Sequence, residues 1–278
     1  MQARPHTFFF ARLTLAGQWK DEVTPIQTAL ESDLTEERGR FKYGFFDFQD
    51  LHADNQRFAF ARLVKYKHVL EGEAVDEKSH QIVDSGLPRG VVAKPELFIH
   101  YSSHIVSYRP IAGRVSSHQF RSIFTSLVEA AHHDFFVSAH LDSINEEFGI
   151  GDALARFSKI SRVSFDLHPT NPSNRPFYRQ LDERLKALNA KRLQHTVTAA
   201  EGGLRSDRLK DDDAMRGLLM AADGFGQGQI EGEAEGRRVV ITTTDAPVRQ
   251  EVLPSEDPQD TLNQLMASFN RTWDRMRR

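Results

Sequence analysis

The first third of the chain contains short aromatic runs, and these constrain the fold more than any other feature of the sequence. Residues 41–48 and 58–70 are rich in β-forming side chains, and the polar stretch from Asp50 to Asn55 separates them. The chain has 20 phenylalanines against five tyrosines and two tryptophans. Phenylalanine carries no polar group that needs a buried partner, so these runs predict sequential antiparallel strands that fill a core.

The other segments before residue 115 extend this β-rich pattern. Residues 7–15 predict a first strand, and 96–101 with 104–108 predict a tight hairpin around Ser102 and Ser103. A short helix is expected around residues 26–34. The polar, glycine- and proline-bearing stretch 71–90 predicts an exposed loop.

From about residue 115 the pattern changes to alternating helices and strands. Ser116 or Ser117 is a suitable cap for a helix whose apolar residues recur at spacings of three and four. The later helices are expected at 145–157, 177–188 and 207–222, and the later strands at 135–141, 160–167, 195–199, 227–233 and 237–244.

These elements predict an α+β fold. A largely antiparallel N-terminal sheet is followed by a ferredoxin-like module with a split βαβ arrangement at about 134–244. The expected parts are a β-rich segment at 1–114, an α+β module at 115–244, an acidic linker at 245–258 and a C-terminal helix at 259–278. That helix carries an apolar stripe, made of Leu262, Leu265, Met266, Phe269, Trp273 and Met276.

Composition excludes several classes of protein. The chain of 278 residues has no cysteine, which excludes a disulfide framework, a thiolate zinc site and a cysteine nucleophile. It contains no apolar stretch near the roughly 20 residues that a spanning helix needs, and the apolar run at its start is too short for a signal peptide. We therefore expect a cytoplasmic protein with no membrane partner and no cofactor.

The histidines and aspartates near residue 135 are candidate metal ligands. Imidazole and carboxylate groups suit borderline metals, and His133, Asp134, His140 and Asp142 supply both. On a strand, Asp134, His140 and Asp142 share one face. No HExxH-type motif accompanies them, and the alternative interpretation is a solvated turn between helix and strand.

Asp166 and His168 are candidate catalytic residues, because they end a predicted strand next to a loop and an aspartate can orient a histidine for general-base work. The alternative is that His168-Pro169 simply ends the strand. The glycines at 224, 226 and 228 resemble a phosphate loop only superficially, since they precede a hairpin and lack a helix N-terminus.

Charge is segregated along the chain, although the total is only −3. Residues 156–195 hold nine basic and three acidic side chains, whereas residues 223–260 hold nine acidic and three basic ones. The basic segment predicts contacts with RNA or DNA phosphates, and its candidate residues are Arg162, Arg175, Arg179, Arg184, Lys186, Lys191 and Arg192. The alternative is that the two segments pair with each other or cover two solvated faces.

The C-terminal helix offers a possible contact with another protein. Its apolar stripe is suited either to docking on the parent domain or to binding a partner protein, and it ends in a basic cluster of Arg271, Arg275, Arg277 and Arg278.

Three strings of the chain resemble uncharacterised bacterial proteins of mobile elements and phage-defence loci. They are RFAFARLVKYK from Arg57, FIHYSSHIVSYRP from Phe98 and VSFDLHPTNPSNRPF from Val163. The resemblance implies a defence or mobile-element context and no site residue. The sequence therefore predicts a non-enzymatic module that binds nucleic acid or a protein partner, with a metal-dependent nuclease or other hydrolase as the alternative.

Overall fold

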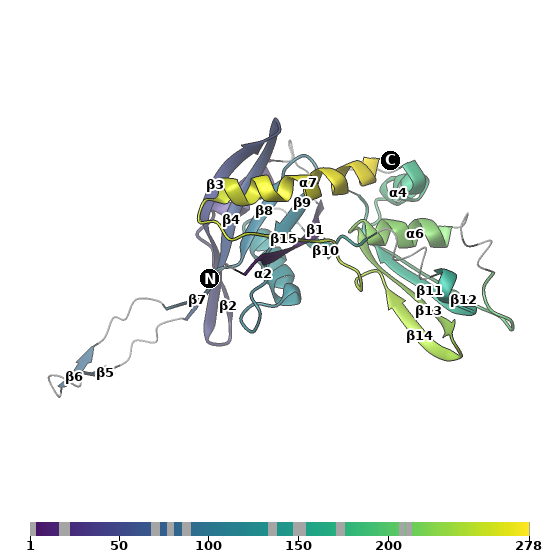
Figure 1. Ribbon diagram of the computed structural model, residues 1–278, viewed down its shortest axis with the longest axis horizontal. Coiled ribbons are helices and arrows are strands. Elements are labelled where there is room, and N and C mark those ends of the chain that lie inside the picture. Colours follow the sequence, from purple (N-terminus) through teal and green to yellow (C-terminus); the bar gives the residue numbers. More distant parts are fainter. Residues whose placement is uncertain are drawn as a thin grey trace.

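The computed structural model describes two lobes and an additional strand pair (Figure 1). The described residues are 4–16, 23–67, 73–76, 81–84, 90–132, 138–146, 154–170, 176–205, 209 and 213–277. Within them, a nine-stranded antiparallel sheet forms the larger lobe and a four-stranded antiparallel sheet forms the smaller lobe. A C-terminal helix lies along the larger lobe and reaches the smaller one.

The nine-stranded sheet has the order β10-β1-β9-β8-β4-β3-β2, with β15 beside β1 and β7 beside β4. Its strands are β1 (His6–Ala16), β2 (Glu36–Arg38), β3 (Phe41–Ala53), β4 (Gln56–Lys67), β7 (Val91–Ala93), β8 (Glu96–His100), β9 (Ile105–Tyr108), β10 (Ser138–Ser143) and β15 (Arg249–Val252). The predicted aromatic runs form β3 and β4, the most extensively paired neighbours in this sheet.

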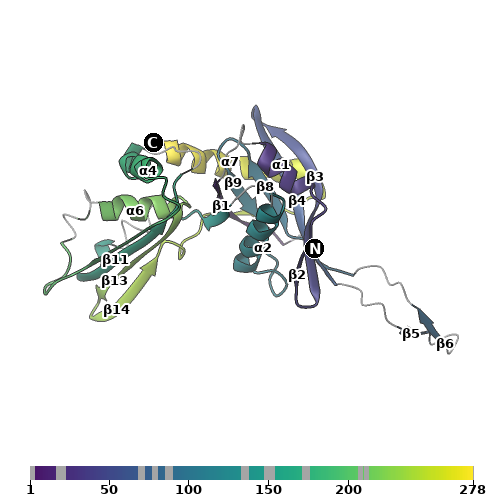
Figure 2. The same ribbon diagram turned by 180° about the vertical axis from the view of Figure 1, so that it is seen from behind.

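Strand alternation divides the aromatic residues between two covered faces. Ala59, Ala61 and Leu63 of β4 face the helices α1 (Thr24–Glu31) and α2 (Ser117–Ala130), which lie in front of the sheet in Figure 2. The intervening residues Phe58 and Phe60 face the opposite side. Both faces of β4 are therefore buried over residues 58–61, which explains why this part of the strand contains no polar residue.

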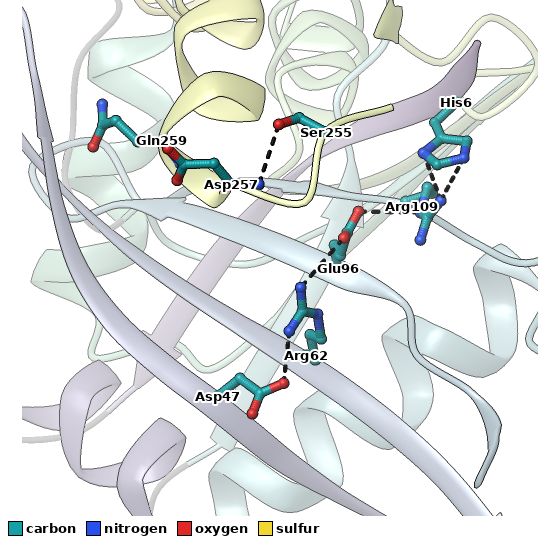
Figure 3. Close-up of polar contacts among 8 residues, drawn as sticks. All are labelled: His6, Asp47, Arg62, Glu96, Arg109, Ser255, Asp257 and Gln259. Carbon is teal, nitrogen blue, oxygen red and sulfur yellow. Dashed lines mark hydrogen bonds and ion pairs between the residues drawn. The ribbon is translucent and has the colours of Figure 1, made fainter. Parts of the chain in front are cut away.

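Helix α7 (Pro258–Arg277) covers the second face of the large sheet. It begins after Asp257, whose Oδ1 accepts a hydrogen bond from the Gln259 N–H at 2.9 Å (Figure 3). The ring of Phe269 lies 5.2 Å from Phe10 and 5.1 Å from Phe58, measured between ring centroids. The predicted apolar stripe is therefore buried against the chain's own sheet.

The smaller lobe contains the split βαβ arrangement that the sequence predicts. Its sheet has the order β12-β11-β13-β14, formed by Leu193–Thr198, Lys159–Leu167, Gly226–Ala234 and Arg237–Thr242 in that order. Helix α6 (Asp213–Ala222) connects β12 to β13, and β11 lies between these two strands. Helices α4 (Arg179–Ala187) and α6 lie on one side of this sheet (Figure 1), so the α+β class is confirmed.

Two glycines allow close approach within the smaller lobe. A Cβ atom at Gly217 of α6 would lie 2.4 Å from the Phe165 ring, so the missing side chain lets the helix rest on β11. Gly226 has φ +137°, and a Cβ there would lie 2.0 Å from the Asp166 carbonyl oxygen. Glycine is therefore required where β13 begins beside the end of β11.

The division between the lobes differs from the predicted boundary near residue 115. Helix α2 packs on the large sheet, and β10 pairs with β1, because Ala139 and Leu141 complete the core beneath α2. The smaller lobe therefore begins after β10. The predicted linker at 245–258 contains β15, which pairs with β1, and the predicted loop at 71–90 contains the paired strands β5 (Glu73–Asp76) and β6 (Gln81–Asp84).

No helix among the described residues is both long enough and apolar enough to span a membrane.

Replacing Phe269 by alanine tests the docking of α7. The side chain is 1% exposed, so truncation should lower the free energy of unfolding by about 3–5 kcal/mol, as measured by urea denaturation. Leu253→Ala is the matched control, because Leu253 is 64% exposed and its truncation should change stability by less than about 0.5 kcal/mol. Equal effects of the two substitutions would contradict the docking.

Candidate functional site

The face of the four-stranded sheet opposite α4 and α6 carries a cavity of about 410 Å³. Seven hydroxyl or amide side chains contribute to its lining, namely Ser164, Gln194, Thr196, Gln227, Gln229, Thr242 and Thr244. Phe165, Asp166 and Gly228 complete the lining. We call this surface the open face, because no described helix or strand covers it.

Strand alternation explains why the open face is polar. In β11, Val163, Phe165 and Leu167 are buried toward the helices, so Ser164 and Asp166 point to the other side. The β12 partners of Ser164 and Asp166 are Thr196 and Gln194, and cross-strand partners share a face. The surface is therefore rich in groups that both donate and accept hydrogen bonds.

Three arginines border the open face, and each is held by a carboxylate. Arg162 and Arg238 pair with Glu231 at 2.6 and 2.8 Å. Arg192 binds Asp166 with Nε and Nη2, and its Nε lies 2.6 Å from Oδ1. The arginine side chains are 46%, 79% and 55% exposed, in the order given. Each guanidinium has five N–H donors, so solvent-facing donors remain after the ion pair has formed.

Asp166 is held in its ionised form. The hydrogen bonds from Arg192 lower the pKa of the Asp166 carboxyl below its usual value, against the opposing effect of partial burial. Gln194 contributes a weaker contact, with its Nε2 3.4 Å from Asp166 Oδ2. A negative charge is therefore fixed at the edge of the cavity.

His140 and His168 stack beside this edge, at the contact between the two lobes. His140 lies on β10 of the large sheet, and His168 follows β11 of the small sheet. Their ring centroids are 3.7 Å apart and the ring planes differ by 9°. The backbone N–H of His168 donates to the Phe225 carbonyl oxygen at 3.0 Å, which fixes the position of His168.

The pKa values of the groups around this stack are shifted in different directions. Burial is the largest of the effects that lower the pKa of His140 to about 4; His168, Lys191 and Arg192 act in the same direction, and Asp166 opposes them. Burial raises the pKa of Asp142, whereas His168 and Arg121 oppose this increase. His140 is therefore neutral at pH 7.

Two buried atoms next to the stack have no hydrogen-bond partner in the described part of the chain. They are Asp142 Oδ2 and His168 Nδ1. Such atoms are rare in folded proteins and often mark sites that bind water or a ligand. Asp142 lies opposite Arg12 in the pairing of β10 with β1, and His140 lies opposite Thr14. The Arg12 Nε and Thr14 Oγ1 atoms also lack partners among the described residues.

Arg12 is the largest fully buried side chain in the described residues and joins the lobes. Its Nη1 donates to the Ser103 carbonyl oxygen at 2.5 Å, its Nη2 contacts Met276 Sδ, and its guanidinium lies 4.7 Å from the Phe225 ring centroid. Burial lowers the pKa of Arg12 to about 10, and the nearby Asp223 opposes this decrease. Arg12 therefore remains charged at pH 7.

Asp223 supplies the carboxylate of this junction. It is 1% exposed and accepts hydrogen bonds from the Tyr178 hydroxyl at 3.1 Å and from Arg275 Nη2 at 3.3 Å. Arg275 also donates to the Asn145 carbonyl oxygen at 2.8 Å. The end of α7 is thus tied to the turn after α6.

A second polar cluster crosses five neighbouring strands of the large sheet, and Figure 3 shows its chain of contacts. Arg62 lies 2.7 Å from Asp47 and 3.8 Å from Glu96, while Arg109 lies 3.3 Å from Glu96 and 2.6 Å from His6 Nδ1. Burial and then Arg109 lower the pKa of His6. Each of these five residues contacts another residue of the cluster. The cluster is therefore suited to holding the strands together in the part of the sheet that lies past the N-terminal end of α7.

The predicted metal and catalytic candidates lie together in the structure. His140 stacks on His168, and both Asp142 and Asp166 act electrostatically on His168. His133 and Asp134 lie outside the described residues. Within the described part of the chain, no three histidine, aspartate or glutamate side chains form a group that could hold a metal ion.

The predicted basic residues lie on different sides of the smaller lobe. Arg162 and Arg192 border the open face, and Lys191 precedes β12 beside the histidine stack. Arg179, Arg184 and Lys186 lie on α4, on the opposite side of the sheet. Arg184 pairs with Asp213 at 3.2 Å, and Lys186 pairs with Asp182 at 2.8 Å. Arg175 is outside the described residues.

Comparison with known proteins identifies the family. The model of the family described as Domain of unknown function (DUF4747) matches residues 27–269. The chain belongs to the DUF4747 family. No curated protein matches it. The match extends over both lobes of this DUF4747 chain, including the open face and the histidine stack.

Sequence reasoning missed the polar amides of the open face and the buried Arg12. Gln194, Gln227 and Gln229 belong to no motif, but the alternation of LQHTVT in β12 is a signal that one side of the strand is polar. Arg12 lies within an apolar run. A charged residue in a strand that is otherwise expected to be buried is the signal that could have identified it.

The stability of this DUF4747 protein should fall as the pH is lowered from 7 to 5. His100 is 3% exposed, and burial followed by Arg12 lowers its pKa to about 4. The unfolded chain binds a proton near pH 6.5 and the folded chain does not, so stability should fall by about 2 kcal/mol over this interval. His140 acts in the same direction.

Urea denaturation at both pH values measures this change. His100→Gln should reduce the pH dependence, whereas His118→Gln, which replaces an exposed histidine of α2, should leave it unchanged. Identical pH dependence in wild-type protein and His100→Gln would contradict this explanation.

Proposed function

We propose that the protein binds single-stranded nucleic acid on the open face of the four-stranded sheet. The observation that carries the proposal is the cavity of about 410 Å³ lined by amide and hydroxyl side chains from all four strands or the turns that follow them. Bases of a single strand are unstacked and expose their hydrogen-bonding edges, which protein side chains read directly.

The amides of Gln194, Gln227 and Gln229 are suited to base edges. Each amide offers a carbonyl acceptor and two N–H donors, so one side chain can contact a donor and an acceptor of the same base. Gln227 and Gln229 are two residues apart on β13 and share a face, and Gln194 lies on β12, on the other side of β11. The three amides therefore span the width of three strands.

The arginines at the border are suited to phosphates. Arg162, Arg192 and Arg238 are exposed, and their carboxylate partners keep the guanidinium groups in place. Arginine binds phosphate through parallel N–H donors, which positions a strand without reading its sequence. The arginines would hold the backbone while the amides contact bases.

We further propose that this binding serves a bacterial antiviral or mobile-element system. The support is the resemblance of the segments that begin at Arg57, Phe98 and Val163 to proteins of such loci. The third segment includes Ser164 and Asp166 of the open face.

Replacing the bordering arginines tests the proposal. Fluorescence anisotropy with a labelled single-stranded oligonucleotide, titrated at several salt concentrations, gives the affinity and its salt dependence. The triple variant Arg162→Gln, Arg192→Gln and Arg238→Gln should bind more weakly. The slope of log affinity against log salt should fall in magnitude by about 2, since each lost phosphate contact removes about 0.7.

Two further variants make this test specific. Arg249→Gln replaces an exposed arginine of β15 in the larger lobe and should bind as the wild type does. Arg179→Gln with Arg184→Gln removes two charges of α4, on the opposite side of the small sheet, and should have little effect. Unchanged affinity in the triple variant would refute binding at the open face.

A further inference from the structure

We propose that His140 and His168 cleave RNA bound on the open face, with His140 as the general base and His168 as the general acid. This inference rests on the proposed function and adds a chemical step to it. The substrate class is single-stranded RNA, because the reaction uses the ribose 2′-hydroxyl group.

The histidine stack lies next to the open face. Asp166 lines the cavity, and His168 follows two residues later, on the same side of the chain by strand alternation. His140 stacks on His168 with 3.7 Å between the ring centroids. A strand that crosses the open face past Asp166 therefore brings a phosphodiester to both rings.

The two imidazoles have different surroundings, as an acid and a base in one site require. His140 is partly buried and has the positive side chains of Lys191 and Arg192 nearby, which favour its neutral form. His168 has two carboxylates close enough to act on it, Asp142 from β10 and Asp166 from β11. Two stacked imidazolium ions repel each other, so the stack is expected to carry at most one extra proton.

The partnerless atoms support this assignment. Asp142 Oδ2 and His168 Nδ1 are both buried without a hydrogen-bond partner among the described residues, and the two side chains interact electrostatically. A carboxylate near an imidazole stabilises the protonated ring through its charge, without a hydrogen bond between these two atoms in the structure. Asp142 therefore acts as a positioning residue for His168.

The proposed reaction conserves atoms and protons. Neutral His140 takes the proton of the 2′-hydroxyl, and the 2′-oxygen forms a bond to phosphorus. The bond from phosphorus to the 5′-oxygen breaks, and His168 donates its proton to that leaving oxygen. The products are a 2′,3′-cyclic phosphate and a 5′-hydroxyl end, and exchange with water restores both rings. Lys191 and Arg192 are exposed cations at this place and would stabilise the charge on the phosphate oxygens.

The test uses the full chain with a labelled single-stranded RNA in the presence of EDTA. Mass spectrometry should detect 2′,3′-cyclic phosphate ends. His140→Asn and His168→Asn should each lower the cleavage rate at least about a hundredfold, while RNA binding measured by anisotropy stays within about threefold of wild type. Thermal unfolding of each variant establishes that it is folded.

Two controls distinguish cleavage by this protein from cleavage by a contaminating nuclease and from binding alone. His118→Asn replaces an exposed histidine of α2 and should cleave at the wild-type rate. An RNA with a single 2′-deoxyribose at the cleaved position should bind but remain intact.

Asp142→Asn tests the role of Asp142. It should lower the cleavage rate and shift the alkaline limb of the pH–rate profile, whereas a purely structural role would leave that profile unchanged.

Three results obtained while RNA still binds would overturn the inference. They are bound RNA that stays intact, cleavage that EDTA abolishes, and cleavage that persists in both histidine variants. The first leaves binding at the open face standing, so failure of cleavage is distinguishable from failure of the proposed function. Absence of both binding and cleavage would overturn the two proposals together.

Discussion

The burial of Arg12 at the contact between the lobes is the interaction on which the rest of the structure depends. A guanidinium that is 0% exposed keeps its charge only if the surrounding groups compensate for lost water. The Ser103 carbonyl provides this compensation from one part of the chain, and the Phe225 ring and the nearby Asp223 provide it from another. Arg275 of α7 then binds Asp223. One buried charge thus couples the large sheet, the small lobe and the last helix.

This junction determines where the candidate site lies. Arg12 and Thr14 of β1 lie opposite Asp142 and His140 of β10, so the edge of the large sheet presents these groups toward the small lobe. The turn that carries Asp223 also leads into β13, whose side chains line the open face. The lobes therefore meet with the histidine stack between them and with the amide-lined cavity next to it. A change at Arg12 would alter this arrangement without touching a residue of the cavity.

The sequence predicted most of the fold but only parts of the site, for a physical reason. Strand and helix periodicity are local, so β3, β4, α2 and α7 could be read from the spacing of apolar residues. The pairing of β10 with β1 joins segments about 130 residues apart, and no local pattern specifies it. His140 and His168 were separate candidates for the same reason. Charge counting along the chain predicts one basic surface at 156–195, although Arg192 and Arg184 lie on opposite sides of the small sheet.

The most direct test of binding on the open face is photocrosslinking of a single-stranded RNA that carries 4-thiouridine, followed by mass spectrometry of the crosslinked peptides. Binding on the open face predicts crosslinks to β11, β12, β13 and β14, in peptides containing Ser164, Gln194, Gln227 or Thr242, and to the segment around His168. Crosslinks confined to α4, or to the large sheet, would contradict it.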